Sequence, residues 1–342
     1  MADEHGTPSS SAGAQAQLTP DILFQLATGF MSAKHLFAAN ELGLFEKLSE
    51  GAATLDDLAK RLGLPRNTTR ITADAMVALG LVERRGDLYQ NAPVAAAFLS
   101  ARPLADLRPF LRFWNRLSYP RWVRFEEALR KGHGVYGALK FTEEEQKIFN
   151  EGVEAFSGRG AEAMAAAYDF GRHRRLLDLG GGTGSFLLAA LRRHPRLRCT
   201  LYELPAAAAV ARQRLAGSPH AAQIEIVEGN FLSDPIPEGH DAILVANVVH
   251  ALSPENNHAL LRRTRERVAP GARLLLVDLW TDPTHTEPVF AALMAGEFLV
   301  MSGEGDVYSE VEAREWLGKT GWREVEFKSL TGPASLIVAE AV

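Results

Sequence analysis

The sequence predicts a chain of two domains, a helical winged-helix domain followed by an α/β domain. Three observations support this prediction. The length of 342 residues is more than one ordinary domain needs. The first hundred residues show helical spacing of apolar side chains, and apolar strands alternate with helices from about residue 174 onward. We expect a disordered tail over residues 1–20, the winged-helix domain over 21–100, a helical linker over 101–160 and the α/β domain over 161–342.

The composition excludes several classes of protein. Lys and Arg total 37 and Asp and Glu total 42, a net charge of −5, whereas a non-specific nucleic-acid binder needs a positive excess to displace counterions. Cys199 is the single cysteine, which excludes an internal disulfide and a Cys-rich zinc site. The sequence lacks the apolar run of a signal peptide or a membrane-spanning helix, so we expect a cytoplasmic protein that does not bind membranes.

Short helices and a hairpin are expected over residues 21–99. Thr54, with Asp57 three positions on, is typical of a capped helix start, and a further helix is expected over 67–79. Leu81–Tyr89 indicates two short strands around a Gly-Asp turn. The order of helix, turn, helix and hairpin predicts a winged-helix module.

A winged helix can bind DNA or serve for dimerisation. Arg66 and Arg70 would lie at the start of a DNA-recognition helix. The rest of that helix is Thr, Ile, Ala, Met, Val and Leu, which suits packing better than a phosphate surface. The acidic total and the sparse basic face therefore favour dimerisation, with a DNA-binding regulator as the less favoured alternative.

The segment between residues 101 and 168 is helical and rich in aromatic residues. Each of these side chains alone is most simply a core residue. As a group they can wall an apolar pocket for a flat ligand. They include Phe110, Phe113, Trp114, Tyr119, Trp122, Phe125, Tyr136, Phe141, Phe149 and Phe156.

The α/β part is expected to place its ligand at the carboxyl ends of its strands. Strands are expected over 175–179, 198–203, 223–227, 241–246, 273–278, 323–328 and 334–339, and helices over 184–193, 205–215 and 254–268. The residues that follow these strands are therefore the candidate site.

A glycine-rich loop follows the first of these strands and opens a helix. Residues 178–184 read Asp-Leu-Gly-Gly-Gly-Thr-Gly. Glycines at such a point let the backbone approach a ligand closely. The spacing is Gly-x-Gly-x-Gly, which is neither the Gly-x-Gly-x-x-Gly of a dinucleotide fold nor a Gly-Lys-Ser/Thr phosphate loop.

Two further strand ends carry polar groups suited to a nucleoside. Glu203 ends the second strand about twenty residues beyond the loop, where a carboxylate can accept both hydroxyls of a ribose. Asn230 follows the third strand and can hydrogen-bond an adenine edge, with Phe231 packing on the ring. The three strand ends together indicate a nucleoside without phosphates.

This combination resembles the class I S-adenosylmethionine-dependent methyltransferases. With its winged-helix start the chain is similar to the large dimeric small-molecule O-methyltransferases, which include the caffeate and hydroxyindole enzymes and a bacterial natural-product branch. The resemblance covers nearly the whole chain from Leu18 and includes residues 36–45, 149–153 and the glycine loop. It implies a Rossmann-like domain, homodimerisation through residues 21–100, S-adenosylmethionine as cofactor and S-adenosylhomocysteine as product.

The resemblance also implies the residues that bind the cofactor. They are Asp178, Gly180, Gly182, Glu203, Leu204, Asn230, Phe231 and Asn247. The chain departs from the family at several of its positions. Asn230 stands where Asp is usual, and Ala246 where a Lys is frequent. Ala251-Leu252 stands where Asp-Trp is usual, and Val307, beside Asp306, where a second carboxylate is expected.

By the same resemblance the catalytic residues are His250 and Asp278. Methyl transfer from a sulfonium is an in-line displacement, so the enzyme must align a nucleophile and remove its proton. Because a phenol has a pKa of about 10, a neutral imidazole against the hydroxyl helps at neutral pH. Asp278 ends the fifth strand and is expected to hold the imidazole by its other nitrogen.

Apolar side chains are expected to form the acceptor pocket, although each alone is most simply core. They are Phe149, Val153 and Phe156 in the linker and Met294, Phe298 and Met301 near the end of the chain. Their character favours a flat aromatic acceptor. No metal is expected, because no His and carboxylate cluster has ligand spacing.

The sequence therefore predicts a homodimeric O-methyltransferase that methylates a phenolic hydroxyl of an aromatic small molecule, in natural-product biosynthesis, with His250 as general base. An N- or C-methyltransferase, or an enzyme that binds S-adenosylmethionine without methylating, is an alternative on the same fold. The sequence names neither the acceptor nor the position methylated.

Overall fold

The computed structural model describes residues 19–136, 141–330 and 332–342. Its first domain holds α1 (Asp21–Glu41), α2 (Leu44–Leu48), β1 (Ala53–Thr54), α3 (Leu55–Leu62), α4 (Arg66–Ala78), β2 (Val82–Arg85), β3 (Leu88–Asn91) and α5 (Pro93–Phe98). The order of α3, α4 and the β2–β3 hairpin is consistent with the predicted winged helix. The predicted tail over 1–20 lies almost wholly outside the described residues.

A three-stranded antiparallel sheet accompanies these helices, in the order β1–β3–β2. The hairpin was predicted, whereas the short strand β1 was not. Thr54 caps α3 as expected, because its side chain accepts a hydrogen bond from the backbone N–H of Asp57. Phe45, Met76 and Tyr89 are buried at the centre of this domain.

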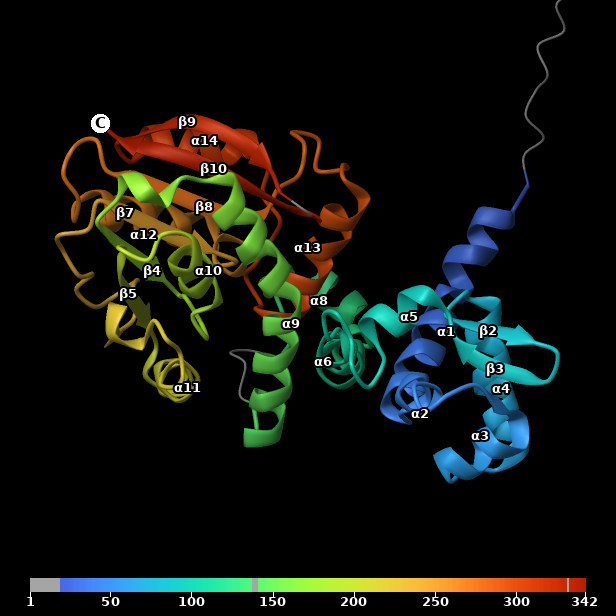
Figure 1. The fold of residues 1–342 in the computed structure, drawn as a ribbon. Coiled ribbons are helices and arrows are strands. Elements are labelled where there is room, and N and C mark those ends of the chain that lie inside the picture. The colour runs from blue at the N-terminus through green and yellow to red at the C-terminus, as the bar shows by residue number, and fades with distance from the viewer. Residues whose placement is uncertain (1–18, 137–140, 331) are drawn as a thin grey trace, which may run out of the picture.

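The linker is a series of helices that ends in one long helix. It comprises α6 (Arg108–Phe113), the π-helical turn η1 (Trp114–Ser118), α7 (Tyr119–Trp122), α8 (Phe125–Lys131) and α9 (Glu143–Ala167). In Figure 1, α9 runs along the α/β domain on the side that faces the first domain. The expected boundary between residues 160 and 161 therefore falls inside a continuous helix.

The α/β domain is built on a seven-stranded sheet in the order β6–β5–β4–β7–β8–β10–β9. Its strands are β4 (Arg175–Leu179), β5 (Arg198–Glu203), β6 (Ile224–Glu228), β7 (Ala242–Ala246), β8 (Arg273–Leu279), β9 (Trp322–Ser329) and β10 (Ala334–Ala341). Strand β10 pairs antiparallel with both β8 and β9, and the other pairs of this sheet are parallel. All seven strands were predicted to within one residue at each end, except that β10 extends two residues further.

Helices and short turns connect these strands. They are η2 (Phe170–Arg172), α10 (Ser185–Arg193), α11 (Pro205–Leu215), η3 (Ala221–Gln223), η4 (Val249–Ala251), α12 (Pro254–Arg265), α13 (Val289–Met301) and α14 (Glu310–Lys319). Helices α13 and α14 were not predicted, and α12 ends three residues before its predicted end. No helix in the described part of the chain is long and apolar enough to cross a membrane.

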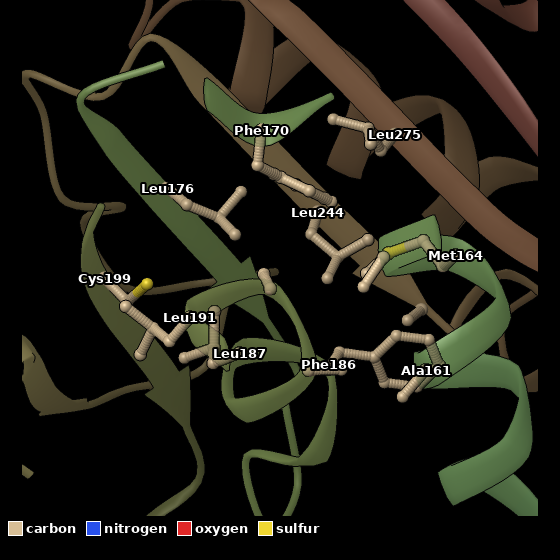
Figure 2. Close-up of a cluster of buried hydrophobic side chains, with 14 of the residues drawn as sticks. Ala161, Met164, Phe170, Leu176, Phe186, Leu187, Leu191, Cys199, Leu244 and Leu275 are labelled. Carbon is tan, nitrogen blue, oxygen red and sulfur yellow. The ribbon is translucent and has the colours of Figure 1, made fainter. Parts of the chain in front are cut away.

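Two hydrophobic cores hold the sheet between its helices. Successive residues of a strand point to opposite faces, so Leu176 packs in one core and Leu177 in the other. The first core joins the sheet to α9, α10 and α11, and the second joins it to α12 and α14. Figure 2 shows the first core, where Met164 of α9 and Leu187 of α10 lie around Leu244 of β7. Cys199 is buried in this core, where it packs as a small apolar side chain.

The strand order places a switch point between β4 and β7. The chain runs outward from β4 through β5 to β6, and then returns to the other side of β4 with β7 and β8. Ligands of open α/β sheets bind at the carboxyl ends of the strands at such a point. The glycine loop follows β4 and the His250 segment follows β7, so both lie at this place.

Candidate active site

A mostly apolar cavity of about 220 Å³ lies between the linker helices and α13. All six predicted acceptor residues line it: Phe149, Val153, Phe156, Met294, Phe298 and Met301. The two sets come together because each is spaced for one face of its helix, α9 or α13. Three aromatic side chains of α6 and η1, Phe110, Phe113 and Trp114, complete the wall.

Aromatic contacts give this wall its shape. Phe110 stacks on Phe156, with ring centroids 5.6 Å apart and planes 13° apart. Phe113 lies 5.9 Å from Phe149. Close packing of α6 on α9 requires Gly152, since a Cβ there would lie 2.4 Å from the Cβ of Phe113. The cavity is therefore lined by flat faces that suit a flat ligand.

His250 lines the same cavity and is held from behind by Asp278. The Nδ1 of His250 lies 2.6 Å from Oδ1 of Asp278, whose side chain is 1% exposed. The backbone N–H groups of His250 and Leu279 also donate to this carboxylate, at 3.3 and 2.8 Å. In a neutral imidazole, a carboxylate with these donors favours the tautomer that has its proton on Nδ1, which leaves Nε2 as an acceptor.

The ring of Phe298 fixes the plane of the imidazole. Its centroid lies 3.8 Å from that of His250, with the two planes 13° apart. The turn η4 that carries His250 begins after Asn247, which has a positive φ of 56°. Asn tolerates this conformation better than most residues. Backbone, carboxylate and aromatic ring together restrain the imidazole.

The conformation and the close neighbours of the glycine loop both require glycine. Gly180 and Gly182 have positive φ values of 69° and 54°, a conformation that other residues adopt at a cost. A Cβ on Gly180 would lie 2.9 Å from Val248, and 3.4 Å from Phe231. The structure therefore brings Phe231 to the glycine loop, as the prediction requires.

Asp178 lies under this loop as an unpaired buried carboxyl. It is fully buried, and neither of its side-chain oxygens has a hydrogen-bond partner in the described residues. Burial, together with the charge of the neighbouring Glu203, raises the pKa of Asp178 to about 8. An unsatisfied buried carboxyl is costly. It fits a ligand that brings an N–H donor, such as the ammonium group of the methionine part of the expected cofactor.

Glu203 reaches the glycine loop from β5. Its carboxylate accepts hydrogen bonds from the backbone N–H groups of Gly182, at 3.0 Å, and Leu204, at 2.8 Å. Burial raises the pKa of Glu203, and these two donors lower it again in part. Leu204 is half exposed. The carboxylate keeps lone pairs for further donors, such as ribose hydroxyls.

Asn230 and Asn247 occupy the remaining predicted cofactor positions. The side-chain oxygen of Asn230 accepts from the backbone N–H of Leu232 at 2.9 Å, which leaves its amide nitrogen available. Asn247 donates to the hydroxyl of Ser157 at 3.3 Å and lines the aromatic cavity. Asn247 therefore stands between the glycine-loop side and the cavity side of the site.

Two acidic residues of the site were not found from the sequence. Glu154 of α9 accepts from Thr183 at 2.7 Å and from Arg214 at 2.6 Å, which joins the linker to the glycine loop and α11. Glu297 of α13 is buried and lines the cavity. The only available signal for Glu297 was its spacing between Met294 and Met301 on one helix face.

The position of the expected second carboxylate is apolar. Val307 is buried and packs with Leu279 and Ala291. Asp306 contacts the His250 segment through its backbone, whose N–H donates to the carbonyl of His250 at 3.1 Å. Over the described ranges, no group of three His, Cys, Asp or Glu residues is arranged to hold a metal ion.

The buried carboxyl of Asp178 makes stability depend on pH. Between its ordinary pKa of 3.8 and the folded value of about 8, the folded chain holds a proton that the unfolded chain has released. Each rise in pH in this window therefore lowers the free energy of unfolding. Residue 178 of the Asp178→Asn variant cannot titrate. In the cofactor-free protein, the urea midpoint of this variant minus that of the wild type should therefore increase from pH 5 to pH 8.

Urea unfolding at several pH values measures this difference. The control is Asp87→Asn, since the side chain of Asp87 is 92% exposed. Its midpoint should keep a constant offset from the wild type. If the urea midpoints of Asp178→Asn and the wild type changed in parallel with pH, the raised pKa of Asp178 would be contradicted.

Comparison with known proteins agrees with this architecture. Residues 118–323 match the O-methyltransferase domain and residues 24–101 match the O-methyltransferase dimerisation domain. A 3-hydroxy-5-methyl-1-naphthoate 3-O-methyltransferase of Streptomyces sahachiroi is 33% identical over 322 residues, which cover 92% of this chain and 93% of that protein. The N,N-dimethyltransferase OxyT of Streptomyces rimosus is 30% identical, with 88% and 90% covered.

A solved structure has the same fold. Human N-acetylserotonin methyltransferase in complex with SAM superposes with a TM-score of 0.86 at 26% identity, over 96% of this chain and 99% of that one. The match to the dimerisation domain supports homodimerisation. These findings confirm the family expected from the sequence motifs. The chain belongs to the O-methyltransferase family and is an S-adenosylmethionine-dependent O-methyltransferase.

Proposed function

We propose that this enzyme methylates a phenolic hydroxyl of an aromatic small molecule in natural-product biosynthesis, with His250 as general base. The observation that carries the proposal is the imidazole at the wall of an aromatic cavity, held through Nδ1 by Asp278. The relatives named for a naphthoate and for tetracenomycin polyketide synthesis support an aromatic acceptor.

The residues of the cavity would divide the work between positioning and proton removal. S-adenosylmethionine, when bound, supplies a methyl group already activated by its sulfonium. The aromatic wall would hold the acceptor ring and exclude water, so that its hydroxyl is aligned. Nε2 of His250 would take the hydroxyl proton, and Asp278 would act as a positioning residue that stabilises the imidazolium.

Eight residues at the strand ends would bind the cofactor. Asp178 would accept from the ammonium group, and Glu203 from the ribose hydroxyls. Asn230 would donate through its free amide nitrogen to the adenine edge, beside Phe231. The other four cofactor-binding residues would be Gly180 and Gly182 in the glycine loop, Leu204 after β5, and Asn247 at the boundary of the cavity.

The first domain would form the homodimer. The outer surface of α1 exposes a run of large apolar side chains: Ile22, Leu23, Phe24, Leu26, Phe30 and Met31. An apolar surface of this kind favours a protein partner. A cytoplasmic location, without membrane or nucleic-acid partners, is part of the same proposal.

Two alternatives differ in their products or ligands. N-methylation is supported by the relative named as an N,N-dimethyltransferase, and the mass and fragmentation of the product distinguish it from O-methylation. DNA binding is disfavoured because Arg66 pairs with Asp56 at 2.7 Å and Arg70 with Asp74 at 3.1 Å. A salt-dependent shift of duplex DNA in a gel would support it nonetheless.

The ribose assignment is tested with Glu203→Ala. Loss of a carboxylate that accepts two hydroxyls should weaken S-adenosylmethionine binding by about 10- to 100-fold, measured by calorimetry. The matched control is Glu228→Ala, which removes a carboxylate from the end of the neighbouring strand, where it pairs with Arg212. Equal affinity of Glu203→Ala and the wild type would show that the assignment is wrong.

The general base is tested with His250→Ala. Turnover of a phenolic acceptor should fall by about 10²- to 10⁴-fold, because the proton acceptor is lost. S-adenosylmethionine binding should persist in the same calorimetric assay. The control is His258→Ala on α12, whose ring lies against Trp316. Unchanged turnover would remove the general-base role and leave catalysis by proximity alone.

A further inference from the structure

Glu297 places a carboxyl in a wall that is otherwise mainly apolar. It is 3% exposed and lines the aromatic cavity from α13. Met294 and Met301 line the same cavity one helical turn on either side. Burial of a carboxyl among such neighbours is unfavourable unless hydrogen bonds compensate it. The position therefore calls for an explanation.

Only one of its two oxygens is accounted for. Oε2 accepts from the hydroxyl of Ser118 at 2.7 Å and from Nε1 of Trp122 at 2.6 Å. Oε1 is buried and has no hydrogen-bond partner in the described residues. Burial raises the pKa of Glu297, while the Ser118 and Trp122 hydrogen bonds and the charge of Arg121 act in the opposite direction.

A purely structural role of Glu297 would explain the hydrogen bonds of Oε2 but not the burial of Oε1 without a partner. The bonds to Ser118 and Trp122 tie α13 to the linker, and a side chain with a single acceptor would do the same. The second oxygen is left unsatisfied beside a cavity that holds the acceptor under the proposed function. An O–H or N–H group of a bound molecule would satisfy it, whereas an apolar or anionic group would leave it unpaired or repel it.

We propose that Glu297 is a specificity-determining residue, which selects aromatic acceptors that carry a second neutral O–H or N–H donor beside the hydroxyl methylated. This inference rests on the proposed function. It disfavours acceptors that carry a carboxylate at this place, because that carboxylate would face the carboxyl of Glu297. The preferred class is aromatic diols and aminophenols.

The chain offers a variant that reverses the polarity of the group. In Glu297→Gln the amide oxygen must stay with Trp122, because the indole N–H can only donate. The amide nitrogen then takes the place of Oε1 and offers a donor where the carboxylate offered an acceptor. Glu304→Gln is the matched control, since Glu304 is an exposed carboxyl outside the cavity lining, hydrogen-bonded to Asn256.

The experiment compares 2-naphthol, 2,7-dihydroxynaphthalene, 2,3-dihydroxynaphthalene and 3-hydroxy-2-naphthoate as probes. Calorimetry with S-adenosylhomocysteine present measures their binding, and product mass measures methyl transfer. Wild-type protein and Glu304→Gln should bind at least one diol about tenfold or more tightly than 2-naphthol, and should bind the naphthoate worst. In steady-state kinetics of methyl transfer, this preference should appear mainly as a lower KM for the diol.

Glu297→Gln should lose the preference for the diol and gain affinity for the naphthoate. An equal loss for all probes would assign Glu297 a structural role and overturn the inference, as would an unchanged preference. A binding preference without any methyl transfer would instead overturn the proposed function. Absence of binding by every probe would overturn both.

Discussion

The in-register parallel pairing of β4, β7 and β8 is the constraint on which the rest of the site depends. Asp178 of β4 lies opposite Leu244 of β7, and Ala246 of β7 lies opposite Val277 of β8. All three strands therefore end at one edge of the sheet. The pairing brings His250, which follows β7, against Asp278, the second-last residue of β8, and keeps both next to the glycine loop. A slip of one residue would turn Asp278 to the opposite face of the sheet.

The linker converts this edge into an enclosed site. Helix α9 packs on the sheet at one end and supplies the aromatic wall at the other, so the cavity belongs to both parts of the chain. Two acidic side chains connect the linker helices to the α/β domain. Glu154 of α9 pairs with Arg214 beside the glycine loop, and Glu297 of α13 accepts hydrogen bonds from Ser118 and Trp122. The Glu154 contact lies beside the proposed cofactor site, and the Glu297 contacts lie beside the proposed acceptor site.

Much of this arrangement could be predicted from the sequence because it follows from local patterns. Strands β7, β8 and β10 contain continuous apolar runs, and the acceptor residues show helical spacing, so their shared face followed once the helices formed. Glu297 could not be found in this way. Its spacing puts it on one face with Met294 and Met301 only once α13 is known to be a helix, and its partners Ser118 and Trp122 lie 179 and 175 residues away in the chain. The unpaired oxygens of Asp178 likewise depend on burial, which the motif does not specify.

The central claim is that Asp278 holds His250 with its proton on Nδ1, so that Nε2 is free to accept a proton from the acceptor. Nitrogen NMR of the protein labelled with ¹⁵N-histidine tests this most directly, at a pH where the imidazole is neutral and with the signals assigned by their loss in His250→Ala. The account predicts a protonated Nδ1 and an unprotonated Nε2 for His250. A proton on Nε2 in the wild-type enzyme would contradict it.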